Sequence, residues 1–295
     1  LRALIDHQGN EARLPVVSIS DAPRFGYRGL HLDVSRNFQT VDAVLRLLDV
    51  MAFYKLNTFH FHLTDDEGWR IAIPGLPELT DVGSQRGHTT DERDHLLPSH
   101  GSGPIPDLLP GSGFYTRDEY IQILTYARER HIEFIPEIDL PGHARAAIVA
   151  MEARYHRLTA AGDPEGATAF RLVDPEDTST YRSVQMWDDN VIDVCLPSSY
   201  AFIEHVVDAL HSMHEEANHP LRVLHTGGDE VPQGVWENAP ACGGRDMATL
   251  NDAYLNRMYD ILQQYGIQLA GWEEVGLNPD HSTGREPNPA FVDRG

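Results

Sequence analysis

Residues 221–230 have the sequence LRVLHTGGDE, in which a short apolar run is followed by two glycines and two acids. The run Leu221–Leu224 predicts a buried strand, and the glycines predict a turn at its end. Adjacent carboxylates on a straight strand point to opposite faces, but both can reach one pocket where the chain bends after the strand. Two acids held this close do not both ionise easily, so one pKa is expected to rise. Asp229 and Glu230 are therefore candidate functional acids, although a surface Asp-Glu pair is common in a chain with 45 acids.

The same pattern of a strand with a polar end recurs along the chain, in alternation with amphipathic helices. We predict strands at 29–34, 56–63, 132–139, 191–196, 221–224 and 267–270, and helices from 41, at 120–130, 143–152, 198–214 and 249–265. Successive parallel strands need crossover connections, so six such units indicate a parallel sheet. Charged and aromatic residues follow the strands, where (β/α)8 barrels place their sites. The predicted fold class is α/β, a (β/α)8 TIM-type barrel that is incomplete, with about six strand–helix units.

A doubly wound open sheet would show a similar alternation, but such sheets usually begin with a glycine-rich phosphate loop. The glycines at 227–228 are followed by acids, which would repel a phosphate. Residues 74–116 and 155–190 show no sustained period and are expected to be irregular.

The composition limits the classes of binding partner. The formal net charge is −22, which disfavours phosphate backbones and anionic lipid but leaves a neutral substrate unaffected. No apolar run approaches the roughly 18 to 20 residues of a membrane span. The two cysteines, Cys195 and Cys242, could form one disulfide or none.

Further charged side chains follow other predicted strands: Arg36, Asp65, Asp66, Asp139 and His143. Each alone is more often part of a structural ion pair than of a site. Together they would lie on one edge of the sheet, which scattered surface charge does not predict.

The pair His60 and His62 could bind a metal ion or fill the barrel interior. No lysine or further histidine is expected at the later strand ends, so the interior role is favoured and no metal is predicted. Trp69 and Trp272 follow strand ends, where an indole can stack on a sugar ring or pack in the core.

Four sequence blocks, in order, resemble the family-20 glycoside hydrolases, which are β-N-acetylhexosaminidases. They are YRGLHLDVSR at 27–36, HFHLTDDEGW at 60–69, PEIDLPGH at 136–143 and HTGGDE at 225–230. The resemblance runs from about Val16 to Gly276 and implies a (β/α)8 barrel behind a small α+β domain. Residues 1–20 are then expected to be the remnant of that domain or its linker. Residues 21–295 are expected to be the catalytic barrel without its C-terminal units.

The resemblance also implies a function: retaining exo-hydrolysis of terminal N-acetylglucosamine or N-acetylgalactosamine through an oxazolinium formed by the substrate's own acetamido group, with transglycosylation as a further outcome. Glu230 matches the general acid, and Asp229 matches the carboxylate that orients the acetamido N–H. Arg36 matches the residue that binds the terminal sugar's hydroxyls. Asp65, Asp139 and His143 match groups supporting the acids, and Trp272 matches a wall of the acetamido pocket.

The family's later Tyr, Asp, Trp and Glu residues of the pocket have no counterparts here, so a second chain or fragment is expected to complete the barrel. The expected partners are N-acetylhexosamine-containing oligosaccharides, with no nucleic acid, membrane or cofactor. An extracellular, periplasmic or lysosomal-type compartment is favoured over the cytoplasm. The alternatives are a non-catalytic amino-sugar-binding fragment and a metal-dependent barrel hydrolase. Gluco or galacto preference stays open.

Overall fold

The computed structural model describes residues 5–8, 11–106, 111–277 and 287–288, and its centre is a parallel sheet. Five strands lie in the order β3 (Gly29–Asp33), β4 (Thr58–Asp65), β6 (Glu133–Ile138), β7 (Val223–His225) and β8 (Gln268–Ala270). A two-residue strand, β5 (Gly68–Trp69), pairs antiparallel with the end of β4. Within the described residues β3 and β8 are the two edges, so the sheet is open. The expected α/β class with an incomplete parallel sheet is confirmed.

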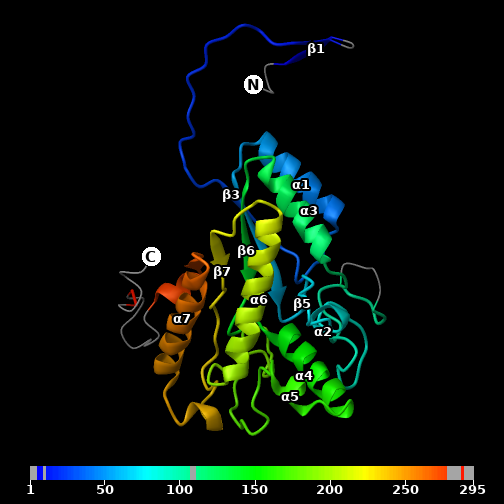
Figure 1. The fold of residues 1–295 in the computed structure, drawn as a ribbon, viewed down its shortest axis with the longest axis vertical. Coiled ribbons are helices and arrows are strands. Elements are labelled where there is room, and N and C mark those ends of the chain that lie inside the picture. The colour runs from blue at the N-terminus through cyan, green and yellow to red at the C-terminus, as the bar shows by residue number, and fades with distance from the viewer. Residues whose placement is uncertain (1–4, 9–10, 107–110, 278–286, 289–295) are drawn as a thin grey trace.

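Helices connect the strands, and four of the longest lie along the sheet (Figure 1). These are α1 (Val41–Phe53), α3 (Arg117–Arg128), α6 (Pro197–Glu216) and α7 (Met247–Gln264). The remaining helices are α2 (Glu78–Asp81), α4 (Arg145–Ala160) and α5 (Pro164–Thr168), with single 3-10 turns at η2 (Pro240–Cys242) and η3 (Glu273–Gly276). Thr40 and Thr116 fix two of the helix starts, because each side chain accepts a hydrogen bond from the backbone N–H three residues later.

The core lies between the sheet and these helices. Every residue of β4 is buried. Phe59 and Phe61 of β4 pack edge-on against Phe134 of β6, which in turn contacts Tyr120 of α3. Aromatic groups of this size contribute about 1.5–3 kcal/mol each when fully buried. This packing holds the central strands in register, so their C-terminal ends meet at one edge of the sheet.

The strand predicted at 191–196 is wrong. The segment is largely buried, but its backbone bonds run to loops: Ile192 N–H donates to Pro141 O, and Asp193 N–H donates to Leu172 O. A short apolar run does not reveal whether its backbone partners belong to a sheet or to other loops. The described sheet therefore has five parallel strands in place of the six expected, and β7 is the fourth.

The helix predicted at 143–152 begins two residues later and continues to Ala160, and α5 follows within the segment expected to be irregular. The second half of α4 faces solvent, so it lacks the apolar period that marks a helix. It is instead tied to α2 by ion pairs of Arg154 and Arg157 with Glu78. The described part of the loop at 74–116 is mainly irregular as expected, apart from α2.

At the N-terminus, β1 (Asp6–Gln8) and β2 (Glu11–Arg13) form an antiparallel hairpin. An extended, exposed segment at 14–23 joins it to the first strand of the sheet (Figure 1). The interpretation of residues 1–20 as a domain remnant stays a prediction, and its first part, Leu1–Leu4, lies outside the described residues.

Cys195 and Cys242 form a disulfide, which settles the question left open by the sequence. It joins the residue shortly before α6 to the end of η2. Of the helices in the described part of the chain, none has the length and apolar character needed to cross a bilayer.

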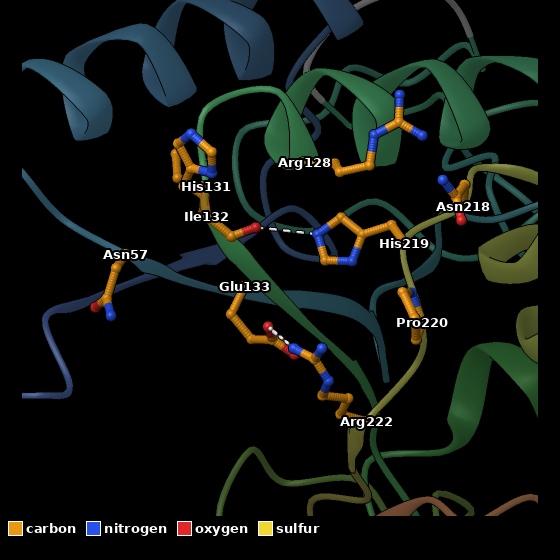
Figure 2. A pocket seen from close by; sticks show the side chains of 9 residues that line it. All are labelled: Asn57, Arg128, His131, Ile132, Glu133, Asn218, His219, Pro220 and Arg222. Atoms are coloured by element: carbon orange, nitrogen blue, oxygen red, sulfur yellow. Dashed lines mark hydrogen bonds and ion pairs between the residues drawn. The ribbon is translucent and has the colours of Figure 1, made fainter.

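A cavity of about 390 Å³ lies at the N-terminal ends of β4, β6 and β7; we call it the base cavity (Figure 2). Its polar lining is already paired in part. Arg222 forms an ion pair with Glu133 at 2.9 Å, and the His219 ring is 3.0 Å from the carbonyl oxygen of Ile132. It is lined by Asn57, Arg128, His131, Ile132, Glu133, Asn218, His219, Pro220 and Arg222.

Candidate active site

His143 lies among acids that come from three neighbouring strands. Its Nδ1 is 3.1 Å from an oxygen of Asp65 at the end of β4. Its Nε2 is 3.4 Å from Glu230 and 3.6 Å from Asp229, both of which follow β7. His143 and Asp139 follow β6. The structure thus brings five predicted residues to the C-terminal edge of the sheet: Asp65, Asp139, His143, Asp229 and Glu230, which we call the rim.

The turn after β7 directs both adjacent acids toward His143. Gly227 and Gly228 have φ of 67° and 84°, and Glu230 itself has φ of 51°. A Cβ on Gly227 would lie 1.6 Å from Oδ1 of Asp139, so no other residue fits at this position. The close approach of this turn to Asp139 explains why the glycine precedes the acids.

Asp139 is almost fully enclosed. Its side chain carries an oxygen, Oδ1, without a hydrogen-bond partner in the described part of the chain, and the residue is 2% exposed. Burial raises its pKa well above the ordinary value, and the charges of Asp229 and Asp65 act in the same direction. Its backbone N–H donates to Oγ1 of Thr64 at 3.1 Å. The neutral form of this acid is therefore favoured.

His143 is held as a cation. Burial opposes its charged form, but hydrogen bonds with Asp65 and Asp66 and the charges of Asp65 and Asp139 outweigh this and raise its pKa to about 12. Burial would also raise the pKa of Asp65, but the bonds to His143 and His62 hold it below the ordinary value. The Asp65 carboxylate and the His143 imidazolium are therefore in direct contact next to Asp229 and Glu230.

Asp229 has a raised pKa, and the main cause is burial; the charge of His143 opposes the rise. Of the adjacent pair, Asp229 is therefore the acid whose pKa is raised. The causes are burial and the more distant charges of Asp65 and Glu137. Glu230 is about one-third exposed and accepts a hydrogen bond from Nε2 of Gln185 at 2.9 Å. Gln185 is a contact that the sequence did not indicate.

Arg36 lies beside the rim and is surrounded by acids. Its guanidinium is 2.6 Å from Asp65, 3.0 Å from Asp33 and 2.9 Å from Glu67. A quarter of the side chain remains exposed, so one edge is accessible to a ligand.

Asp66 serves the loops around the rim. Its carboxylate accepts hydrogen bonds from the backbone N–H of Arg145 at 3.2 Å and from Asn190 at 3.0 Å. It also lies 3.5 Å from His143. These contacts join the start of α4 to the loop that precedes α6.

Trp272 follows β8 and contacts histidines. Its ring centroid is 4.9 Å from that of His225, 5.7 Å from His60 and 5.8 Å from His31. Its backbone N–H donates to the carbonyl of Gly227, so it adjoins the turn that leads to the acids. The indole is over one-third exposed and available to a ligand.

The sequence reasoning missed Glu137 and its histidines. Glu137 is fully buried in β6, within 2.9 Å of His60, His62 and His225. The strand register aligns His62, Glu137 and His225 in one row. The expectation that no further histidine stands at the later strand ends is wrong, because His225 ends β7. A charge inside an apolar strand was the available signal, since a buried charge needs partners.

Several groups of three described side chains place potential metal ligands within 4.8 Å of one another, including His60, Glu137 and His225. The ring nitrogens of these two histidines are 2.7 and 2.9 Å from Glu137. Ligands of a tetrahedral zinc ion with bonds of about 2.0 Å would be separated by about 3.3 Å. These groups therefore contact each other directly, and we assign no metal to them.

Comparison with known proteins agrees with this arrangement. The profile of "Glycosyl hydrolase family 20, catalytic domain" matches residues 25–287, which is most of the chain. The chain belongs to glycosyl hydrolase family 20. The resemblance inferred from the four blocks is confirmed.

Curated relatives in family 20 include beta-hexosaminidase B of Pseudoalteromonas piscicida, which is 44% identical over 90% of this chain. N,N'-diacetylchitobiase of Vibrio harveyi is 53% identical over 77% of the chain. The matched segments cover 35% and 26% of these relatives' own lengths, so the chain spans about a third or less of them.

Among solved structures, the family-20 exo beta-N-acetylglucosaminidase of Vibrio harveyi in complex with N-acetylglucosamine superposes with a TM-score of 0.75 at 39% identity. The match covers 92% of this chain and 39% of that one. The barrel class expected from the sequence is confirmed, and the open sheet described above is part of such a barrel.

Proposed function

We propose that this family-20 chain provides the acid pair of a retaining exo-β-N-acetylhexosaminidase, which removes terminal N-acetylhexosamine by substrate-assisted catalysis. The observation that supports this most strongly is His143, which contacts Asp65 with one ring nitrogen and Glu230 and Asp229 with the other. General acid catalysis needs an acid that is both positioned and accessible. The rim supplies such an acid on a rigid, buried support.

In this proposal Glu230 protonates the glycosidic oxygen and then, as a carboxylate, activates a water. Its partly exposed side chain can reach both a leaving group and solvent. The His143 imidazolium and the Gln185 amide lie against its carboxylate, and both stabilise the anion formed when the proton leaves.

Asp229 accepts the N–H of the substrate's 2-acetamido group, whose oxygen attacks the anomeric carbon. Burial raises the pKa of Asp229, and an N–H donor would favour its anionic form again. Oδ1 of Asp229 has no hydrogen-bond partner in the described residues, and 21% of the side chain is exposed, so this carboxylate has acceptor capacity left for a ligand. The charge of the oxazolinium then forms next to a carboxylate that the substrate itself has helped to ionise.

The remaining predicted residues have supporting roles. Arg36 presents its exposed edge to the hydroxyls of the terminal sugar, and Trp272 forms one wall of the acetamido pocket. Asp139 supports the turn at Gly227 from below. The second chain or fragment expected to complete the barrel would supply the rest of the pocket.

For the substrate we propose chitin-type fragments and other glycans that end in N-acetylglucosamine, because relatives are a chitobiase and an exo beta-N-acetylglucosaminidase. Transfer of the sugar to another hydroxyl is a second outcome of the same intermediate. A compartment outside the cytoplasm is supported by the disulfide between Cys195 and Cys242.

The test is release of nitrophenol from an aryl N-acetyl-β-glucosaminide, measured for this chain and for the longest natural polypeptide that contains it. We expect Glu230→Gln and Asp229→Asn each to lower kcat by about a hundredfold or more. Adding acetate or azide to Glu230→Gln tests the acid-base role, because small anions replace a missing carboxylate base.

Unchanged activity in both variants would refute the assignment of the acid pair. Sugar binding by calorimetry without turnover in either polypeptide would favour the non-catalytic amino-sugar binder. Loss of activity with chelator, restored by stoichiometric metal, would favour the metal-dependent hydrolase.

A further inference from the structure

His62 lies between two carboxylates, one on each ring nitrogen. Nδ1 is 2.7 Å from Oε2 of Glu137, and Nε2 is 2.7 Å from Oδ2 of Asp65. A neutral imidazole carries a single N–H, and its other nitrogen presents a lone pair. The contact with Glu137 is not aligned as a hydrogen bond, but at 2.7 Å an unprotonated nitrogen, which carries partial negative charge, would still be repelled by the carboxylate oxygen. Both nitrogens of His62 must therefore carry protons when both acids are ionised.

The other charged groups around His62 do not replace Glu137. Nη1 of Arg36 is 3.4 Å from Nε2, on the Asp65 side. Asp139 lies close to His62 and Asp65 on that same side. Only Glu137 faces Nδ1 among the described contacts, so the second proton depends on this one carboxylate.

Glu137 is itself surrounded by imidazoles from three strands. Both of its oxygens are buried, and among the described residues neither makes a well-aligned hydrogen bond, so the carboxylate is held by close electrostatic contacts. The ring nitrogens lie between 2.7 and 3.7 Å from the carboxylate and belong to His31, His60, His62 and His225. Four imidazoles around one carboxylate favour its ionised form. This buried anion is the second-last residue of β6 and lies just below the rim.

Charges then alternate from the interior to the acid pair. The order is Glu137 (negative), His62 (positive), Asp65 (negative), His143 (positive) and Glu230, with every contact at 3.4 Å or less. His62 and His143 each lie between two carboxylates. Each charge in the series therefore stabilises the opposite charge beside it. We propose that Glu137 is a positioning residue, which keeps His62 doubly protonated and so keeps Asp65 as the anion that supports His143. The link to catalysis rests on the proposed function of His143 and Glu230.

Without the Glu137 charge, His62 would keep one proton, on the nitrogen that faces Asp65. Asp65 would lose a full positive neighbour but would keep its contact with Arg36 at 2.6 Å. The effect on the acid pair should therefore be partial. Supporting groups of this kind commonly change activity by about tenfold to a hundredfold.

The first experiment needs no turnover: ¹⁵N NMR of the histidine side chains in the intact chain between pH 6 and 10. We expect both nitrogens of His62 to be protonated at pH 8 in the unsubstituted chain, and only one in Glu137→Gln. Glu133→Gln is the matched control, because Glu133 lies on the same strand and pairs with the exposed Arg222. A singly protonated His62 in the unsubstituted chain, or the same change in Glu133→Gln, would overturn the proposal. The test on the unsubstituted chain does not depend on how Glu137→Gln folds, and the other histidine signals of the variant show whether its fold is intact.

The second experiment measures the pH profile of kcat/KM in the longest active polypeptide. Loss of the His62 charge makes Asp65 easier to protonate, so Glu137→Gln should move the acid limb to higher pH and lower kcat by about tenfold, with KM unchanged. A change in KM alone, or a lower rate without movement of the limb, contradicts the positioning role. One bound zinc per chain, found by elemental analysis and removing a His62 proton, would also overturn it. Inactivity of every form, with His62 doubly protonated, would count against the proposed function only.

Discussion

The rim and the base cavity lie at opposite ends of the same strands, and their charged side chains are paired differently. At the base, Arg222 and Glu133 form a direct pair at the surface of a cavity of about 390 Å³. At the rim, His143 is shared among acids from three strands, and Oδ1 of both Asp139 and Asp229 lacks a hydrogen-bond partner among the described residues.

The two ends differ in how their charged groups are balanced. The base has space, but its charged groups are balanced by their neighbours. At the rim, side chains are held in states that burial opposes, which is the arrangement expected of a functional site. Each of the following measurements compares a change at the rim with a change elsewhere.

Gly227→Ala should have the largest effect on stability. Gly227 at the rim and Gly266 at the base share a φ of 67°, but a Cβ meets Asp139 at 1.6 Å in the first case and nothing within 4 Å in the second. The shared backbone strain costs about 1–2 kcal/mol, and the clash adds about 1–3 kcal/mol at Gly227 only. Urea unfolding of the two alanine variants measures the difference. Equal losses would mean that the turn does not press on Asp139.

The pH dependence of stability should be the next largest effect. The pKa of His143 is raised to about 12 in the folded chain from 6.5, so its contribution is complete below pH 6.5 and is lost as the pH rises toward 12. Between pH 7 and 9 the free energy of unfolding should fall by about 2.5 kcal/mol on this account. His143→Asn should flatten the slope in urea titrations, whereas Arg222→Gln at the base should leave it as it is. Parallel curves for all three proteins would contradict a charged His143.

Asp139→Asn should stabilise the fold by about 1 kcal/mol at pH 8, because the fold favours the neutral form of Asp139 whereas the unfolded chain ionises it, and asparagine removes this cost. The gain should be much smaller at pH 4, where roughly half of this acid is protonated in the unfolded chain as well. Thermal unfolding at the two pH values, with activity assayed alongside, makes the comparison. A loss of stability at both values would show that the carboxylate is well paired.

The smallest effect is expected at the base. Arg222→Gln breaks an ion pair whose arginine is two-thirds exposed, so the loss should be below about 1 kcal/mol. Activity on the aryl glycoside should be unchanged. A large fall in kcat would place a functional role at the end of the barrel where we assign none.

The elements best predicted from the sequence were the strands whose apolar run ends in charged residues. The strands ending near Asp33, Asp65 and His225 were found in this way, and so was the position of Asp229 and Glu230. The segment at 191–196 was mistaken for a strand because burial alone produces an apolar run, whichever partners its N–H groups have. A single sequence does not contain that information.

The interior cluster was missed for a different reason. His31, Glu137 and His225 lie on separate strands, and only the register brings them together. His60 and His62 are separated by one residue, so their pairing is visible in the sequence. Their partners lie on other strands, and sequence spacing gives no sign of them. The contact of Gln185 with Glu230 comes from an irregular loop and had no sequence signal.

The fluorescence of Trp272 can report the ionisation of the histidines that it contacts. Trp69 and Trp236 are almost fully buried, and Trp187 is partly buried against Arg145. The indole of Trp272 is over one-third exposed and lies against three imidazoles. A protonated imidazole in contact with an indole quenches its fluorescence. Emission recorded against pH, and compared with Trp272→Phe, would follow the ionisation of these histidines without a label, and soluble quenchers would report when a sugar covers the ring.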